Sequence, residues 1–210
     1  MVVRNAESMG AAGAVWQAHG YAGAGSVGDL IDCLKGRVAI VVGSADGVFN
    51  ELRFALRHAP DALIFAVNDV GMFLPKVDHW VSLHSDNLGP WKTVRWAHSL
   101  VQEHTKYHSV DPRPYIDYVW DRQTPCFALS GYFAMQIAWI MGASQIVLAG
   151  CPGERKRRFF EMTPRDFDYG SGTEGEGVRL QLINEMERLP DFRAAVRSTS
   201  GWTRSYFGGL

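Results

Sequence analysis

Three short apolar runs constrain the fold of this chain more than any other feature of its sequence. They are Val38–Val42, residues 62–67 and Gln145–Ala149, and each is followed directly by a glycine or an asparagine. Strands that face water on one side alternate between apolar and polar residues, whereas these runs are apolar almost throughout. Short, β-branched runs of this kind are typical of strands buried on both sides of a parallel sheet.

Segments with helical periodicity lie between and after these runs. Residues 49–58 and 91–103 space their apolar side chains along one helix face, and residues 130–141 form an apolar helix that Gly142 ends. The other segments predict a short helix at 26–34 with Ser26 as its N-cap, strands at 79–83 and 194–197, a helix at 178–188, and irregular backbone at 105–127. This alternation predicts an α/β fold: a single Rossmann-like domain with a mostly parallel sheet of about five or more strands and helices on both faces.

Length and composition fit one domain at residues 26–210. The chain has 210 residues, of which 47% are hydrophobic, and this is enough for a sizeable core. Residues 1–25 are rich in alanine and glycine and predict a loose arm, or a segment ordered against a partner. Residues 151–175 are polar and follow a central strand, so we expect them to form a lid over a ligand site.

Charge and cysteine content exclude several classes of protein. A formal net charge of −1 gives no global attraction to nucleic acid or to an anionic membrane, so neither is expected as a partner. No apolar run is long enough to predict a transmembrane helix. The three cysteines are widely spaced and form no CxxC pair, which favours a reduced, cytoplasmic protein over a disulfide framework.

The ligand site is expected at one edge of the sheet, because ligands of open parallel sheets bind beyond the carboxyl ends of the strands. This rule nominates the segments that follow the expected strands, which are residues 43–47, 68–69, 83–87, 150–158 and 198–201. Several of these segments carry small or polar residues, which leave the backbone amides exposed to a ligand. Gly150 opens the segment that leads into the lid.

The first of these segments is a candidate anion site. Gly43, Ser44, Asp46 and Gly47 lie between a strand and a helix, where free amides favour a phosphate and glycines allow its close approach. The segment is neither GxGxxG nor a Walker A loop, and a plain strand-to-helix turn is an equal alternative. Asn68, after the second strand, is a candidate partner for a ribose or base, and the alternative is a helix N-cap.

Candidates for chemistry lie in the loop after the third strand and in the lid. His84 and Asp86 are candidate acid/base groups, because the ordinary pKa of an imidazole is about 6.5; the alternative is a structural hydrogen bond within the loop. Arg155 and Arg158 belong to a basic run that could neutralise a diphosphate, and the alternative is a solvated basic surface.

Two further groups of residues are assigned mainly structural roles. Ser130 is expected to cap the apolar helix, and with Gly131 it could also offer amides to an anion. His98, His104 and His108 are expected on a solvated surface, because no clear third ligand completes the spacing of a zinc site. No metal site is therefore predicted.

Taken in order, these motifs resemble the bacterial CMP-sialic-acid-dependent sialyltransferases and related Rossmann-like proteins, many of them encoded by tailed phages and prophages. The resemblance runs from Val38 to the C-terminus. It is carried by residues 43–47, by Val67 and Asn68, by Ser130 and Gly131, and by residues 146–150 and 196–203. The phage-encoded proteins look closest, through residues 80–84 and 197–203.

The resemblance implies that Gly43, Ser44, Asn68, Ser130 and Gly131 surround a nucleotide. The sialyltransferases also place tyrosines and a histidine base in or just after the lid. Here the lid contains Arg, Phe and a single Tyr, and no histidine follows His108. The implied function is therefore nucleotide binding more than sialyl transfer.

Three functions are compatible with these features. The first is a glycosyltransferase-like enzyme that binds a nucleotide or nucleotide-sugar as substrate and has no tightly bound cofactor. The second is a non-catalytic nucleotide or small-molecule binder, such as a phage accessory factor. The third is a structural or interaction domain that docks a protein partner, or a second copy, through the N-terminal arm or the aromatic C-terminus. The first is preferred, and fold alone cannot choose among them.

Overall fold

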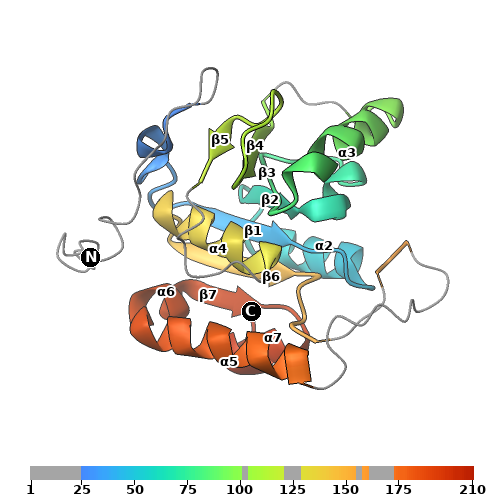
Figure 1. Ribbon diagram of the computed structural model, residues 1–210. Coiled ribbons are helices and arrows are strands. Elements are labelled where there is room, and N and C mark those ends of the chain that lie inside the picture. The colour runs from blue at the N-terminus through green and yellow to red at the C-terminus, as the bar shows by residue number, and fades with distance from the viewer. Residues whose placement is uncertain (1–24, 101–103, 121–128, 155–157, 161–172) are drawn as a thin grey trace.

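The computed structural model describes residues 25–100, 104–120, 129–154, 158–160 and 173–210. Its centre is a seven-stranded sheet with the order β5-β4-β3-β2-β1-β6-β7, in which all neighbouring strands are parallel (Figure 1). The strands are β1 (Val38–Val42), β2 (Leu63–Val67), β3 (His79–Val81), β4 (Lys106–Ser109), β5 (Tyr118–Val119), β6 (Gln145–Ala149) and β7 (Val196–Ser198). The predicted Rossmann-like α/β architecture is confirmed.

Helices cover both faces of the sheet. The helical elements are η1 (Val27–Leu30), α2 (Val48–His58), η2 (Asn68–Met72), α3 (Ser85–Ala97), α4 (Ser130–Ile140), α5 (Thr173–Arg188), α6 (Pro190–Ala195) and α7 (Gly201–Phe207). One core contains side chains of η1, α4, α5, α6 and α7, and the other contains side chains of α2, η2 and α3. In Figure 1, α4 lies in front of the central strands.

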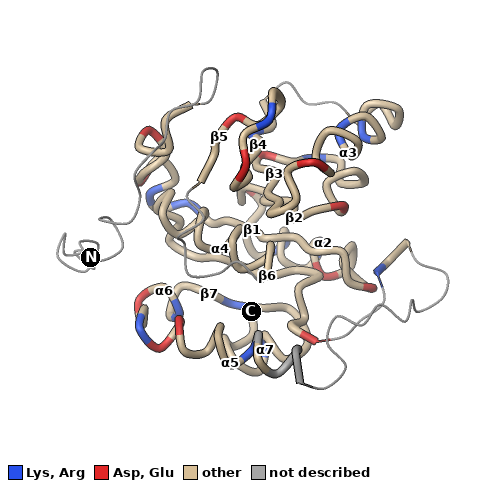
Figure 2. The backbone as a smooth tube through the Cα atoms, viewed as in Figure 1, with Lys and Arg blue, Asp and Glu red and all other residues tan. Residues whose placement is uncertain are grey.

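The apolar runs form the centre of the sheet because they serve both cores at once. Along β1, Ala39 and Val41 belong to the core under α4, while Ile40 and Val42 belong to the core under α2. All four side chains are fully buried. Figure 2 shows no charged residue along β1, β2 or β6. The continuous apolar pattern therefore reflects burial on both sides, as predicted.

Several predicted boundaries were wrong. Residues 105–127 contain two strands, β4 and β5, where irregular backbone was predicted. Helix α3 begins at Ser85 and ends at Ala97 instead of spanning 91–103, and a short helix, α6, precedes β7. Ser26 does cap the first helical turn, because its Oγ accepts a hydrogen bond from the Gly28 amide at 3.2 Å.

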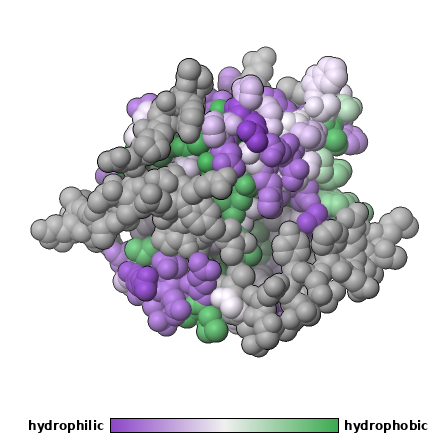
Figure 3. All heavy atoms as spheres, in the orientation of Figure 1, coloured by the Kyte–Doolittle hydropathy of each residue, from purple (hydrophilic) through white to green (hydrophobic). Residues whose placement is uncertain are grey.

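The edge of the sheet formed by β4 and β5 is more polar and less buried than its centre. On the face seen in Figure 3, hydrophilic residues gather over this end of the sheet. β5 has two residues, and both are only partly buried. Among the described residues, no helix has the length and hydropathy needed to cross a membrane.

Candidate functional site

The strand order creates a switch point between β1 and β6, at the centre of the sheet. β1 is followed by α2 on one face, whereas β6 leads to α5 on the opposite face. The two strands are neighbours along their whole length, and beyond their carboxyl ends the chain leads to helices on opposite faces. Such a position is where open α/β sheets bind ligands.

All the nominated loops follow strands that are adjacent in the sheet. They come after β3, β2, β1, β6 and β7, which is also the order of these strands. Because every strand is parallel, the five loops share one edge. The predicted convergence of these five segments on one edge is therefore confirmed, while ligand binding there and the roles of individual residues stay predictions.

Gly43 and Gly150 are required by the close approach of the loops that follow β1 and β6. A Cβ on Gly43 would collide with the carbonyl oxygen of Gly150 and would lie 2.7 Å from the Cys151 Sγ. Gly150 has φ +65°, and a Cβ there would lie 2.6 Å from Cγ2 of Val48. The Ala45 amide donates to the Gly150 carbonyl at 3.2 Å. Packing between the loops thus explains both glycines without a ligand.

A carboxylate that the sequence analysis missed lies at the switch point. Oε2 of Glu51, in the first turn of α2, accepts a hydrogen bond from the Gly150 amide at 2.7 Å and one from the Thr199 hydroxyl at 2.6 Å. Thr199 also donates to the Leu148 carbonyl at 2.9 Å. Glu51 therefore joins α2 to the ends of β6 and β7, and it occupies the amide donor that a ligand anion would seek. A surface acid in a helix gives no sequence signal for this role.

Cys151 lies between the turn after β1 and the start of α4. It is close to Gly43, and a Cβ on Gly131 would be 3.9 Å from its Sγ. Burial, together with the smaller effect of the nearby Glu51 carboxylate, raises the pKa of the Cys151 thiol to about 12. The thiol is therefore protonated at neutral pH and is a poor nucleophile.

The described part of the lid is fastened to the turn after β1. Arg158 and Ala45 form an antiparallel bridge, and the Phe159 amide donates to the Ser44 carbonyl at 3.0 Å. The Arg158 guanidinium pairs with the buried Asp69 carboxylate at 2.6 Å. The Arg158 side chain thus points to the end of β2. A diphosphate bound by Arg158, as predicted, would lie beside the Asp69 carboxylate that already pairs with this guanidinium. Arg155 lies outside the described residues.

Aromatic side chains pack around this lid segment. Phe159 makes edge contacts with Phe49 and Phe73, with ring centroids 4.8 and 5.2 Å apart. Phe160 stacks on Phe73 at 5.7 Å and is 40% exposed. These contacts hold residues 158–160 over the loops that follow β1 and β2.

Asn68 is positioned by its neighbours at the end of β2. Its backbone has φ +55°, and its Oδ1 accepts a hydrogen bond from the Ser82 hydroxyl at 2.8 Å. Its carbonyl accepts from the indole of Trp80. The alternative role of Asn68 as an N-cap was wrong, because Val67 takes that position in η2.

His84 and Asp86 lie at the start of α3 and are both exposed. The His84 amide donates to the Ser82 hydroxyl at 2.9 Å, so the loop forms a structural hydrogen bond through its backbone. Asp86 Oδ1 accepts from Nε of Arg113 at 2.7 Å and lies 2.6 Å from its Nη2. The imidazole of His84 is accessible to an acceptor hydroxyl, while Asp86 is engaged with Arg113.

The remaining candidates lie at the starts of α2 and α4. Gly47 is the N-cap of α2 with φ +90°, and Asp46 beside it is exposed. Ser130 does not cap α4 as predicted: Leu129 is the N-cap and makes no side-chain cap. Ser130 is the first helical residue instead, and Gly131 follows it at the surface facing Cys151.

The expectation of a solvated histidine cluster was wrong for His108. This side chain is fully buried in β4, and its Nε2 lies 2.9 Å from Nδ1 of the buried His79. The indole of Trp120 donates to its Nδ1 at 3.1 Å. His98 and His104 are exposed. The described residues hold no group of three or more His, Cys, Asp or Glu side chains able to bind a metal.

The site thus combines a topological switch point, small residues at the ends of β1 and β6, an uncapped helix start and a lid segment with an ion pair. Comparisons of the chain with protein-family models, with curated proteins and with solved structures found no match. Its function must therefore be argued from this geometry.

Proposed function

We propose that the protein is glycosyltransferase-like and binds a nucleotide or nucleotide-sugar at the carboxyl edge of the sheet, between the loops that follow β1 and β6. The observation that carries this proposal is the switch point itself. There, small residues at the ends of two adjacent central strands meet the start of α4. In open α/β sheets, ligands bind at such a switch point, beyond the carboxyl ends of the strands.

The start of α4 supports the phosphate-binding part of the proposal. α4 has 11 residues, no side-chain cap and no acidic residue in its first turn. Its first amides and its helix dipole therefore favour an anion. Gly131 lies among these amides, and a Cβ there would be in ordinary van der Waals contact with the Cys151 Sγ, at 3.9 Å.

The catalytic part of the proposal assigns roles to His84 and Arg158. Glycosyl transfer requires a base for the acceptor hydroxyl and a cation near the departing phosphate. His84 is exposed in the loop after β3, at the same edge of the sheet, and Arg158 lies over the end of β2. Asp86 and Arg155 were candidates for the same two roles.

A second candidate is a binder that does not transform its ligand. It is favoured by the ion pairs that neutralise the charged candidates: Arg158 is paired with Asp69, and Asp86 with Arg113. Glu51 likewise accepts two hydrogen bonds from the protein. Such pairing is expected of side chains that shape a site more than of side chains that react.

A thermal-shift screen with CMP, UDP, GDP and their sugar conjugates tests the binding. A nucleotide at about 100 times its Kd adds about 2.7 kcal/mol to the free energy of unfolding. The substitution Gly131→Ala places a methyl group beside the first amides of α4. This methyl group makes only an ordinary van der Waals contact with Cys151. It should weaken nucleotide binding roughly tenfold with little change in the melting temperature of the free protein.

Gly177→Ala is the matched control, because a Cβ at Gly177 meets nothing within 4 Å and the site lies elsewhere. Equal nucleotide affinities of the two variants, or no shift with any nucleotide, would contradict binding at the switch point. Release of free sugar from a bound conjugate, reduced in His84→Ala, would distinguish the enzyme from the passive binder.

A further inference from the structure

We propose that the groove between α3 and the β4–β5 edge is a second binding site, and that it takes a planar aromatic compound carrying one anionic group. The groove has a volume of about 770 Å³. That volume lies in the range of small-molecule sites in proteins. The proposal is independent of nucleotide binding at the switch point, because none of the residues lining the groove belongs to the loops after β1 or β6.

Tertiary contacts hold the two walls of the groove. One wall is α3, and the other is the connection that leads from β4 to β5. The Tyr115 hydroxyl, in that connection, donates to the Ser85 carbonyl at 3.1 Å, at the start of α3. A Cβ on Gly89 would lie 2.9 Å from the Tyr115 ring, so the absence of a side chain there lets the walls approach.

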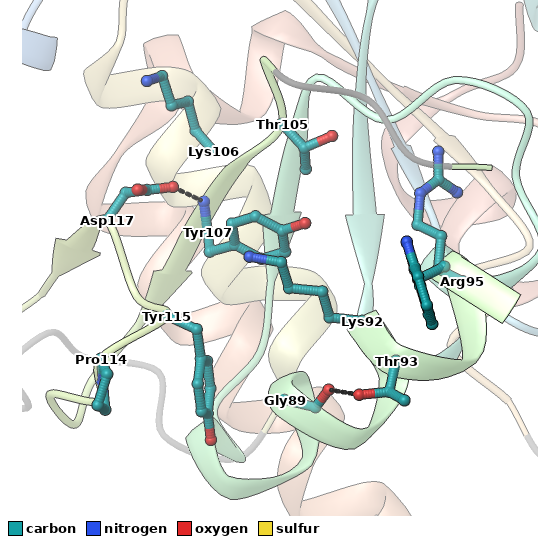
Figure 4. A pocket seen from close by; sticks show the side chains of 11 residues that line it. Gly89, Lys92, Thr93, Arg95, Thr105, Lys106, Tyr107, Pro114, Tyr115 and Asp117 are labelled. Carbon is teal, nitrogen blue, oxygen red and sulfur yellow. Dashed lines mark hydrogen bonds between the residues drawn. The ribbon is translucent and has the colours of Figure 1, made fainter. Parts of the chain in front are cut away.

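The floor is formed by β4 and is both aromatic and basic. The Lys92 ammonium lies 4.5 Å from the centre of the Tyr107 ring, and Figure 4 shows Lys92 extending from α3 across that ring. Asp117 Oδ2 accepts a hydrogen bond from the Tyr107 amide at 2.8 Å, which fixes Tyr107 against the neighbouring connection. In Figure 4, Lys106 points away from the ring.

Hydrogen-bond donors remain available on this floor. Burial, the main cause, raises the pKa of the Tyr107 phenol, so the hydroxyl stays protonated at neutral pH. The hydroxyl makes no hydrogen bond to another described residue, and Lys92 makes no ion pair within the described part of the chain. A carboxylate or phosphate in the groove would pair with the Lys92 ammonium, and the Tyr107 hydroxyl is a further donor on the same floor.

The charge of the groove selects an anion. Of the described residues that line it, Lys92 and Arg95 are basic and Asp117 is acidic, giving a local charge of +1, since 2 − 1 = 1; the third basic residue, Lys106, directs its side chain away from the Tyr107 ring (Figure 4). The whole chain has a formal charge of −1. The Arg95 guanidinium adds its charge from below, where it donates to the Gly71 carbonyl at 2.8 Å.

The aromatic side chains select a planar ring. Trp96 lines the groove from α3 and is 70% exposed, which is unusual for a large aromatic residue that has only a packing role. Tyr115 lines the groove from the other wall. Aromatic rings stack on such surfaces, and an anionic substituent would then reach Lys92.

The test follows backbone amide resonances by NMR during titration with 2-naphthoate, 2-naphthyl phosphate and the neutral 2-naphthamide. Binding at the groove should shift the amides of Gly89, Thr93 and Thr105, while those of Gly43 and Gly150 at the switch point stay in place. The naphthamide should bind roughly tenfold more weakly than the better of the two anions. Comparison of the two anions decides between a carboxylate and a phosphate.

Lys92→Met keeps the aliphatic part of the side chain and removes its charge. It should weaken binding of the anions roughly tenfold and leave the naphthamide almost unaffected. Trp96→Ala should weaken all three probes. Lys35→Met removes an equally exposed lysine outside the groove and should change affinity by less than about twofold. Absence of binding at millimolar concentrations, or equal affinities of Lys92→Met and the wild type for the anions, would overturn the proposal.

Discussion

At the scale of single residues, Glu51 is the side chain that most affects the candidate site. Its carboxylate is partly buried and accepts hydrogen bonds from the Gly150 amide and the Thr199 hydroxyl. Hydrogen bonds to charged groups contribute about 1.5–3 kcal/mol each to stability. A buried amide that loses its hydrogen-bond acceptor lowers the free energy of unfolding further. The position is in the first turn of a helix, where a carboxylate also interacts favourably with the helix dipole.

Replacing this residue should therefore destabilise the fold as well as the site. We expect Glu51→Ala to lower the free energy of unfolding by about 2–3 kcal/mol and Glu51→Gln by about 1 kcal/mol, because the amide oxygen still accepts one hydrogen bond. Urea unfolding measures both. Glu187→Ala, at an exposed position near the other end of the chain, should stay within about 0.5 kcal/mol of the wild type.

A double-mutant cycle with Thr199→Val isolates the contact between Glu51 and Thr199. The two substitutions should be non-additive, since both remove the same hydrogen bond. Additive losses would mean that the hydrogen bond between Thr199 and Glu51 contributes little, and that Glu51 acts through the Gly150 amide and the helix dipole.

At the scale of elements, the sequence predicted the central strands and failed at the edge. β1, β2 and β6 were recognisable because both of their faces are apolar. β4 contains an exposed Lys106 and two buried polar side chains, His108 and Ser109, whose partners are distant in sequence. The spacing of apolar residues along the chain does not reveal partners that are distant in sequence, so irregular backbone was predicted for this strand.

Helix α3 was misplaced for a related reason. The prediction rested on apolar positions that include Val94 and Trp96, but these side chains are 38% and 70% exposed. The buried side chains of the helix are Ser85, Leu88 and Arg95, of which two are polar. The groove escaped notice as well, because its lining comes from three segments that share no local motif.

The junction between α4 and the segment after η1 offers a test at this scale. α4 ends before Gly142, which has φ +91°, and a Cβ there would lie 3.0 Å from Cα of Asp32. The Asp32 and Leu34 amides donate to the last carbonyls of this helix region. Gly142→Ala should therefore cost about 1–2 kcal/mol for the left-handed backbone and about 1–3 kcal/mol more for crowding.

Gly36→Ala separates the two contributions. Gly36 has φ +80°, but a Cβ there meets nothing within 4 Å. It should cost only the backbone part, about 1–2 kcal/mol. Equal losses of unfolding free energy in the two variants, measured by urea titration, would show that the junction yields to the extra methyl group.

At the scale of the whole molecule, polar side chains stabilise two different parts of the sheet, the loops at its carboxyl edge and the interior between β3 and β4. The carboxyl edge is rich in polar contacts that order the loops, such as the Arg158–Asp69 pair. His79 and His108 instead lie inside the sheet between β3 and β4, and they connect to the distant Trp120. The parallel pairing of β4 with β3, which no local pattern predicted, is thereby fixed by side chains.

The histidine pair makes the stability of the whole fold depend on pH. Because the Trp120 indole donates to Nδ1 of His108, the neutral His108 carries its proton on Nε2 and donates it to His79. Burial is the main cause that lowers the pKa of His79 to about 4, and it lowers that of His108 well below its ordinary value. In the unfolded chain both imidazoles bind a proton below about pH 6.5.

The unfolded state therefore binds more protons than the folded state below about pH 6.5, and the free energy of unfolding falls as the pH falls toward 4. Above about pH 6.5 the stabilisation is complete. Between pH 7 and pH 5, where most carboxylates stay ionised, His79 alone should lower the free energy of unfolding by about 2 kcal/mol, and His108 should lower it by a similar amount.

Urea unfolding at several pH values measures this dependence of the unfolding free energy on pH. His108→Gln should flatten it at the expense of stability at pH 7, whereas the exposed His104→Gln serves as the control for a lost imidazole. An unchanged slope in His108→Gln would mean that the acid sensitivity of the fold arises outside this pair.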